Sequence, residues 1–385
     1  MYIVMPAVSL YIPAIVKIVL IVIVVILLLT ESSKGSFPKC VGKLIPVYIV
    51  AIFQLLTVGP KYFLVSVYDL LGYLVVSHVF LYLFYEQKYS LALRLLKSAI
   101  IIYLITAITT IVGNTIFPES SRIMSTGMAE QKAMYDFYRG YNIGSFGFIY
   151  EIVLLVGILP YLFKNRNIPR WITISLYAVA LYCAYITQFT IATLCVVGIG
   201  GFFFLGNLRN TKKVVGYVLA FLVISLLILP TVAQSVTNML GDDSIIGSRV
   251  AELGNIYSES GVDEASDAGE RQSLYLQSFN AFLESPLTGT GKGGGGHSFI
   301  LDTMAKYGLL GILMLWIMLR SIYRIYIRPF RNSAFYGYLL LSYLMYLLLI
   351  FVNPAPLFMS ISFLMPLISC VLDKSNDNLI KKVKI

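Results

Sequence analysis

The sequence predicts an all-α, polytopic integral membrane protein with about eleven transmembrane helices and one large extracytoplasmic loop before the last three. Of its 385 residues, 58% are hydrophobic and only 12% are charged, whereas a soluble domain carries about 25% charged residues. The apolar residues gather in runs of roughly 18–22, the length that crosses about 30 Å of hydrocarbon. These observations exclude a soluble enzyme, a secreted disulfide scaffold and a β-barrel.

The distribution of Lys and Arg orients the predicted helices. The loops and tail on one side hold twenty of these residues and the loops on the other side hold seven, so the positive-inside rule places the twenty in the cytoplasm. The first span contains Pro6, Pro13 and Lys17, and we expect a kinked, retained helix, with an uncleaved signal-like start as the alternative. The predicted spans are 8–30, 44–59, 62–85, 98–117, 141–163, 171–188, 190–206, 214–231, 298–319, 335–352 and 355–372. Because almost nothing joins 171–188 to 190–206, a tight turn is expected near Gln188 and Phe189.

These spans divide the chain into three parts. Residues 1–231 hold the first eight spans and an outer loop at 118–140, residues 232–297 form the large extracytoplasmic loop, and residues 298–385 hold the last three spans and a cytoplasmic tail. Because the basic residues recur in short loops rather than on one face, no nucleic-acid partner is expected. With two histidines and no paired cysteines, neither a metal nor another cofactor is expected.

The large outer loop is predicted to end in an amphipathic helix. Asp267 and Glu270 have the spacing of a capping box, apolar and aromatic residues then recur at helical spacing, and Pro286 ends the helix. Such a helix lies on the membrane interface or folds back against the bundle.

A turn rich in glycine follows that helix. Gly289, Gly291 and four consecutive glycines at 293–296 precede His297, which opens the next span. Glycine lets several backbone N–H groups approach one anion, and a helix N-terminus carries about half a positive charge. The sequence therefore predicts an anion site that includes Gly295 and Gly296, with a flexible hinge at the membrane surface as the alternative. The spacing around Lys292 does not match a nucleotide-binding P-loop.

Residues 267–311 resemble the carboxyl-terminal signature of the bacterial O-antigen ligase and Wzy-type O-antigen and capsular polysaccharide polymerase superfamily. In that family an Arg on a loop helix precedes a Pro-x-x-Gly-x-Gly turn, then His followed by Asn or Ser, then two spaced glycines in a membrane helix. The Arg-x10-Gly loop pattern of some polymerases has no counterpart here. The matching residues are Arg271, Pro286, Gly289, Gly291, His297, Ser298, Gly308 and Gly311.

The resemblance implies a membrane glycosyltransferase that acts on a glycan carried by undecaprenyl pyrophosphate, at the outer face of the bacterial cytoplasmic (inner) membrane. The expected activity is polymerisation of O-antigen or capsule repeat units. One alternative is an O-antigen ligase that transfers the glycan to lipid A core or to a protein. An alternative of another class is a flippase or transporter of the lipid-linked oligosaccharide. The partners implied are this oligosaccharide, membrane lipid and, for a polymerase, a chain-length regulator protein.

Arg271 and His297 match the family motif and are expected to be catalytic. An Arg suits the diphosphate leaving group because its planar fork binds phosphate oxygens in pairs; a surface ion pair is the alternative. A His near the membrane surface suits a general base or a phosphate donor; a hydrogen-bonded helix cap is the alternative.

The remaining candidates rest on residue chemistry and position. Glu151, expected to be catalytic, and Asp69 lie in the outer halves of spans, where a carboxylate usually marks a site; each is expected to accept a proton from a sugar hydroxyl or to bind hydroxyls. A buried structural partner is the alternative for both. Arg139 and Arg249 are expected to contact substrate phosphate, with a solvated ion pair as the alternative for Arg249. Tyr275 is expected to bind substrate through its aromatic ring.

Overall fold

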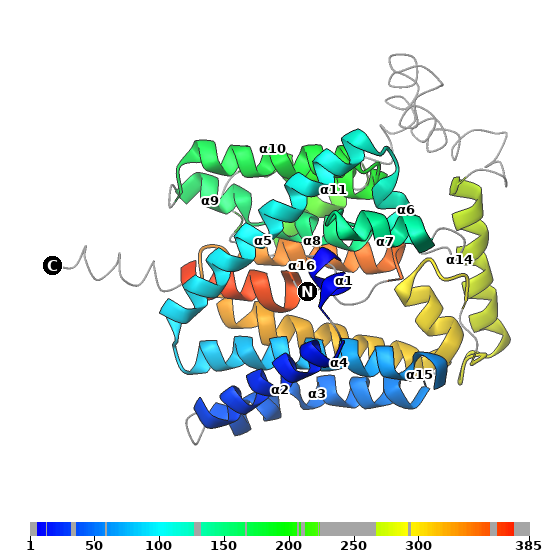
Figure 1. The fold of residues 1–385 in the computed structure, drawn as a ribbon. Helices are drawn as coiled ribbons and strands as arrows, with labels where there is room; N and C mark the ends of the chain where they lie inside the picture. The colour runs from blue at the N-terminus through cyan, green and yellow to red at the C-terminus, as the bar shows by residue number, and fades with distance from the viewer. Residues whose placement is uncertain are drawn as a thin grey trace, which may run out of the picture.

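The computed structural model is all-helical in the residues that it describes (Figure 1). These residues are 6–12, 14–31, 36–57, 60–126, 132–165, 168–205, 208, 212–221, 223, 267–291, 294–354 and 360–372. The longer helices are α2 (Ala14–Glu31), α3 (Ser36–Thr57), α4 (Pro60–Tyr85), α5 (Tyr89–Ile116), α10 (Arg170–Ile186), α14 (Asp267–Glu284), α15 (Phe299–Ile322) and α16 (Tyr336–Val352). The shorter elements are α1 (Pro6–Tyr11), α6 (Ser120–Thr126), α7 (Lys132–Gly140), α8 (Phe146–Val156), α9 (Leu159–Asn165), α11 (Thr190–Gly201), η2 (Tyr323–Ile327), η3 (Arg328–Phe330) and η4 (Ser360–Leu364).

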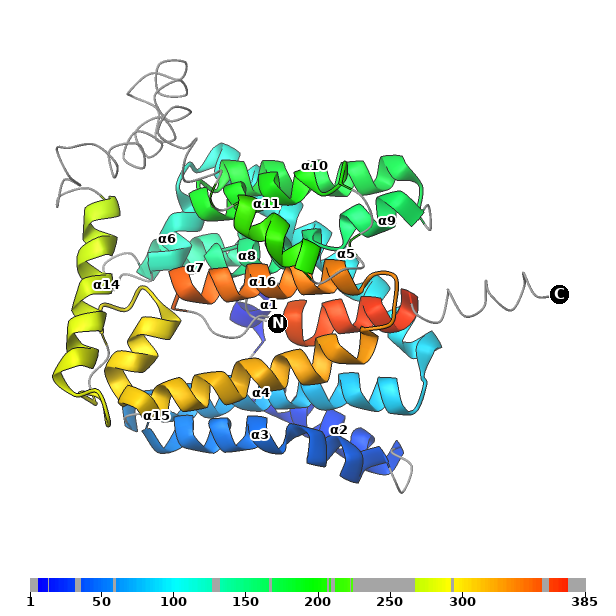
Figure 2. The same cartoon turned by 180° about the vertical axis from the view of Figure 1, so that it is seen from behind.

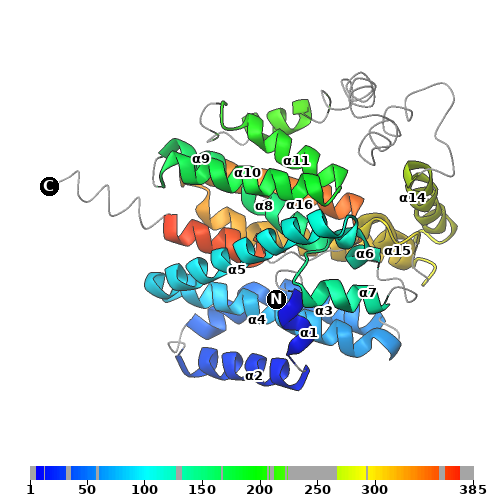
Figure 3. The same cartoon turned by 45° about the horizontal axis from the view of Figure 1, so that its top comes forward.

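Most of these helices run roughly side by side as a bundle, and α14 lies across one end of it (Figures 1 and 2). Helices α2 and α3 lie at one side of the bundle, and α10 and α11 lie at the opposite side (Figure 3). Helix α14 packs against α15, which packs in turn against α3. The amphipathic helix predicted from Asp267 is confirmed, and it ends at Glu284, two residues before Pro286.

Three helical stretches of the described chain are long and apolar enough to cross a membrane: Tyr89–Ile116, Phe146–Asn165 and Phe299–Phe330. The shorter apolar helices are Ile18–Thr30, Leu74–Tyr85, Arg170–Ile186, Thr190–Gly201, Tyr336–Val352 and Ser360–Leu372. The all-α membrane class is thus confirmed, whereas the count of about eleven spans is not. The tight turn expected between 171–188 and 190–206 is confirmed, because α10 and α11 are joined through Gln188, which has a φ of 59°.

Helices α8 and α16 form the centre of the bundle. Nine of the eleven residues of α8 are buried, and the Ser342 hydroxyl of α16 donates a hydrogen bond to the Leu154 carbonyl of α8 at 2.9 Å. By contrast, α2, α3 and α5 expose many large apolar side chains, among them Ile26, Ile52 and Ile101. Such apolar outer faces suit contact with lipid rather than with water.

The span predicted at 298–319 is interrupted. Gly308 has φ 59° and ψ −143°, which is outside the helical region, so α15 consists of two helical segments, 299–307 and 309–322, that meet at this glycine. The shorter segment lies near α14 and the longer one runs to the other end of the bundle (Figure 2). A positive φ costs little at glycine because it has no Cβ, and this is why the turn occurs there.

Candidate functional site at the α14 end of the bundle

The glycine-rich segment is packed between α14 and the start of α15. A Cβ atom at Gly294 would collide with the Ser278 side chain, and one at Gly295 would collide with the Leu274 backbone. Only glycine allows the chain to approach α14 so closely. Gly294 and Gly295 are therefore packing residues that hold the chain against α14, and Gly296, with a φ of 78°, is a turn residue just before His297.

The carboxylate of Asp302, a residue that no sequence pattern indicated, organises this segment. Its Oδ1 accepts hydrogen bonds from the Ser278 hydroxyl at 2.7 Å and from the Gly296 amide at 3.1 Å. Its Oδ2 accepts one from the Ser298 amide at 3.2 Å. The Ser278 hydroxyl in turn accepts a hydrogen bond from the Gly295 amide at 2.7 Å. We call Asp302, Ser278 and the three amides that they hold the Asp302 clasp.

The clasp bears directly on the anion site predicted at Gly295 and Gly296. Their amides do point at oxygen atoms, but these oxygens belong to the chain's own Ser278 and Asp302. A carboxylate near the first turn of a helix also interacts favourably with the positive end of the helix dipole. The chain thus supplies its own anion at the helix start, and direct substrate binding by these two amides stays a prediction.

The motif Pro286–Gly291 is a turn that docks onto the break in α15. The Thr290 amide donates to the Ala305 carbonyl at 2.9 Å and the Gly291 amide donates to the Lys306 carbonyl at 3.1 Å. In the opposite direction, the Leu309 amide donates to the Pro286 carbonyl at 2.8 Å. These bonds satisfy backbone groups that lose their helical partners at Gly308. The spaced glycines of the motif therefore build one interlocked backbone structure.

His297 lies between two residues whose amides are held by the clasp. Its neighbour Ser298 is fully buried and caps α15 by accepting a hydrogen bond from the Leu301 amide at 3.2 Å. The capping role that was the alternative for His297 thus belongs to Ser298. The imidazole itself is half-buried and hydrogen-bonds to no residue in the described part of the chain.

Arg271 and Tyr275 lie one turn apart on α14. Arg271 is exposed, yet it is close enough to both Tyr275 and Tyr150 to act on them electrostatically. Burial raises the pKa of Tyr275; the positive charge of Arg271 opposes this shift and the negative charge of Asp302 adds to it. Tyr275 therefore remains protonated at neutral pH and can donate a hydrogen bond to a ligand.

Asn353 connects this group to the centre of the bundle. Its side chain hydrogen-bonds to Tyr150 on α8, and its carbonyl accepts a hydrogen bond from the Phe299 amide at 2.9 Å. The start of α15 is thereby fixed to the end of α16. No sequence pattern indicated Asn353, and the one signal for Tyr150 was its position next to Glu151.

Glu151 is fully buried and joins three elements. Its Oε2 accepts hydrogen bonds from the Ser360 amide at 2.6 Å and from the Tyr103 hydroxyl at 3.3 Å. The Ser360 hydroxyl also donates to the Glu151 carbonyl at 3.0 Å. These contacts fit the structural alternative, in which the carboxylate ties α8 to α5 and η4, and a catalytic role for Glu151 stays a prediction.

The other predicted residues lie elsewhere or outside the described chain. Arg139 lies in the last turn of α7, with its guanidinium carbon 5.9 Å from the centre of the Tyr135 ring. Asp69 lies within α4, but its side chain is outside the described residues, as is the whole of Arg249. The structure therefore brings Arg271, Tyr275, Gly295, Gly296 and His297 together around the clasp, and it leaves the roles of the others as predictions.

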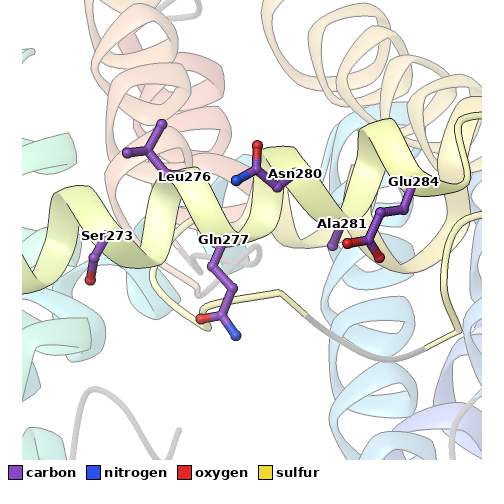
Figure 4. A pocket seen from close by; sticks show the side chains of 6 residues that line it. All are labelled: Ser273, Leu276, Gln277, Asn280, Ala281 and Glu284. Atoms are coloured by element: carbon purple, nitrogen blue, oxygen red, sulfur yellow. The ribbon is translucent and has the colours of Figure 1, made fainter.

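The outer face of α14 carries a shallow, open pocket. Figure 4 shows its six lining side chains, all from this one helix: Ser273, Leu276, Gln277, Asn280, Ala281 and Glu284. None of the predicted site residues lines it. These positions are therefore useful as matched controls on the same helix.

In the comparison with known protein families, the matching region contains this cluster of residues. A family model described as O-antigen ligase matches residues 174–317, which include α14, the described part of the glycine-rich segment and most of α15. Arg271 and His297 lie inside the match, whereas Glu151 and Asp69 lie outside it. No curated protein and no solved structure matches the chain.

Proposed function

The chain belongs to the superfamily of O-antigen ligases and Wzy-type polymerases, and from this premise we propose that it is a membrane glycosyltransferase that polymerises O-antigen or capsular polysaccharide. In the proposed reaction, a hydroxyl of one lipid-linked repeat unit attacks the anomeric carbon of a glycan held on undecaprenyl pyrophosphate. A new C–O bond forms, the bond to the diphosphate breaks, and undecaprenyl pyrophosphate leaves. The hydroxyl proton passes to a base on the enzyme.

The observation that carries this proposal is the cluster around the Asp302 clasp. Arg271 and Tyr275 lie on one side of the clasp, on α14, and His297 lies in the segment that the clasp holds. The cluster thus offers a guanidinium, a phenol and an imidazole at one end of the bundle. A diphosphate leaving group needs the cation, and an attacking hydroxyl needs an acceptor for its proton.

We assign roles to these residues on that basis. The Arg271 guanidinium binds the diphosphate oxygens and stabilises their negative charge as the bond breaks. The Tyr275 hydroxyl donates a hydrogen bond to the substrate. The His297 imidazole accepts the proton of the attacking hydroxyl, because an imidazole exchanges protons near neutral pH. Asp302 is a positioning residue that fixes the backbone on both sides of His297.

Four further assignments belong to the same proposal. Arg139 and Arg249 are proposed as further contacts of the substrate phosphates. Glu151 or Asp69 is proposed to bind sugar hydroxyls or to accept a proton from one of them. The site is proposed to face the exterior of the cytoplasmic membrane, because the predicted loops at the opposite end carry most of the Lys and Arg residues. A chain-length regulator is the proposed protein partner.

The proposal is tested with the Arg271→Ala, Arg271→Lys and His297→Ala variants of the full chain in membranes. Each should lower the formation of long-chain glycan from lipid-linked repeat units by about 100-fold or more, because catalytic hydrogen bonds and proton transfers contribute on that order. Lys at position 271 should not restore activity, since a single ammonium lacks the two-pronged geometry of Arg. The measurement is the glycan ladder together with the release of undecaprenyl pyrophosphate.

The matched control is Gln277→Ala, which changes an exposed position on the same helix (Figure 4) and should leave the rate unchanged. A His297→Ala chain that is inserted at the parental level and works at the parental rate would overturn the site assignment.

The matching family, O-antigen ligase, favours a second candidate, the ligase. A ligase uses the same donor but transfers the glycan to lipid A core or to a protein. The two candidates differ when the purified chain receives the lipid-linked donor alone: a polymerase extends it, whereas a ligase needs the separate acceptor.

A further inference from the structure

A second cluster of cations lies at the end of the bundle away from α14. There, α3 packs beside the far end of α15 and the elements η2 and η3, and a groove of about 970 Å³ opens between them. Lys43 from α3 and Arg320, Arg324 and Arg328 from the opposite wall line this groove, and none of its lining residues is acidic. The four cations are exposed. Their charge is therefore open to an anion that enters the groove.

The arginines are aligned along one wall. Trp316, Arg320, Arg324 and Arg328 follow one another at intervals of four residues, which places them on one face of the helix and its continuation. The guanidinium carbon of Arg320 lies 4.6 Å from the centre of the Trp316 ring, a distance at which the two attract each other. The three arginines line the same groove, so their guanidinium groups can converge on one phosphate headgroup.

Beside the four cations, apolar side chains also line the groove. Ile49 on α3 and Trp316 on α15 both line it and are about half exposed. On α15 the exposed apolar surface continues through Leu313 and Leu310 toward the break at Gly308. One end of the groove is thus cationic, and the surface that leads from it toward the middle of the bundle is apolar.

We propose that this groove binds a membrane phospholipid with an anionic headgroup. The phosphate lies among Arg320, Arg324 and Arg328, where charge-assisted hydrogen bonds are strong, and an acyl chain lies along Ile49 and Trp316. Basic pockets between transmembrane helices are suited to anionic lipids for this reason. A free phosphate would leave the apolar wall uncovered, and the amine of a zwitterionic headgroup would be repelled by the arginines. This site is separate from the one proposed for catalysis.

Trp316 supplies a direct probe, because the chain has only two tryptophans. A Trp171→Phe variant leaves Trp316 as the sole emitter inside the groove. The purified variant is placed in vesicles of phosphatidylcholine, and its fluorescence is titrated with phosphatidylglycerol or phosphatidylcholine that carries brominated acyl chains, which quench tryptophan on contact. The ratio of the two binding constants gives the selectivity for the anionic headgroup.

We expect phosphatidylglycerol to bind at Trp316 about fivefold or more tightly than phosphatidylcholine, since one cation near the membrane surface contributes roughly a factor of five. The combined variant Arg324→Ala and Arg328→Ala, which leaves the Arg320–Trp316 contact intact, should reduce this ratio to near one. The matched control is Arg94→Ala with Lys97→Ala. These two exposed cations on α5 do not line the groove, and their removal should leave the ratio unchanged.

Three results would overturn the proposal. The first is equal quenching of the parental chain by the two lipids. The second is that inorganic phosphate at millimolar concentration relieves the quenching by phosphatidylglycerol in the parental chain, which would show that the cations bind a free anion. The third is that the α5 control loses as much selectivity as the combined Arg324→Ala and Arg328→Ala variant, which would indicate a diffuse charge effect. The comparison of the two lipids needs no arginine variant, so it remains decisive if a variant is poorly folded.

Discussion

At the scale of single residues, the family motif predicted Arg271 and His297 as site residues, but it did not predict the hydrogen bonds that fix the backbone around His297. Arg271 and His297 could be named from the sequence because they match a pattern of residue types. Asp302 could not, because a carboxylate in the first turn of a helix is common and is usually explained by the helix dipole alone. Its role became visible only when the fold brought Ser278, twenty-four residues earlier, within 2.7 Å.

The first prediction concerns Asp302. Asp302→Asn places an NH₂ group where one carboxylate oxygen now accepts a hydrogen bond, so at least one amide loses its partner, and Asp302→Ala removes all of them. Each lost bond to a charged acceptor costs about 1.5–3 kcal/mol, and the misplaced His297 should lower the rate by about 10-fold to 100-fold. The measurement is glycan synthesis together with hydrogen exchange at the Gly296 and Ser298 amides.

Faster exchange at these amides in Asp302→Asn, with the rest of α15 unchanged, would identify a positioning role. Glu284→Gln is the control, because it changes an exposed carboxylate on α14 (Figure 4) and should alter neither the rate nor the exchange. Unchanged exchange at both amides would contradict the clasp.

At the scale of the elements, periodicity and helix-stop residues predicted much of the local structure. The amphipathic helix before Pro286 and the tight turn at Gln188 are present where expected. The break in α15 was not predicted, because apolar residues continue on both sides of Gly308. A hydropathy pattern does not show that the Pro286–Gly291 turn replaces the helical hydrogen bonds at this point.

The second prediction concerns that break. Gly308→Ala should lower the free energy of unfolding by about 2 kcal/mol or more, because a Cβ disfavours the positive φ and would also lie 2.5 Å from the Pro286 carbonyl oxygen. Thermal unfolding in detergent measures the loss. Gly216→Ala is the matched control, since its Cβ would meet nothing within 4 Å. Equal stability of the two variants would show that the turn does not depend on this glycine.

At the scale of the whole molecule, charge and apolar composition predicted a helical membrane protein, and the structure confirms this class. The number of about eleven spans stays a prediction, because three helical stretches of the described chain are both long and apolar enough to cross a membrane. The buried core formed by α8 and α16 also looks, in the sequence alone, like any other apolar run. Burial inside a bundle and exposure to lipid both select apolar residues.

The third prediction concerns orientation. Gln277→Cys on α14 should react with a membrane-impermeant maleimide added to intact cells, and Arg331→Cys, at the opposite end, should react only after permeabilisation. The four native cysteines give little background because all are buried. Labelling is read by gel shift, with the parental chain as the blank. The reverse pattern would place α14 in the cytoplasm and would remove the proposed access to lipid-linked glycan.

The bond between the Phe299 amide and the Asn353 carbonyl has a consequence for how this protein can vary. It joins main chain to main chain, so it persists whatever side chains the two positions carry. Changes of side chain there can therefore alter the surroundings of the proposed site while the segment that holds His297 stays attached to the end of α16.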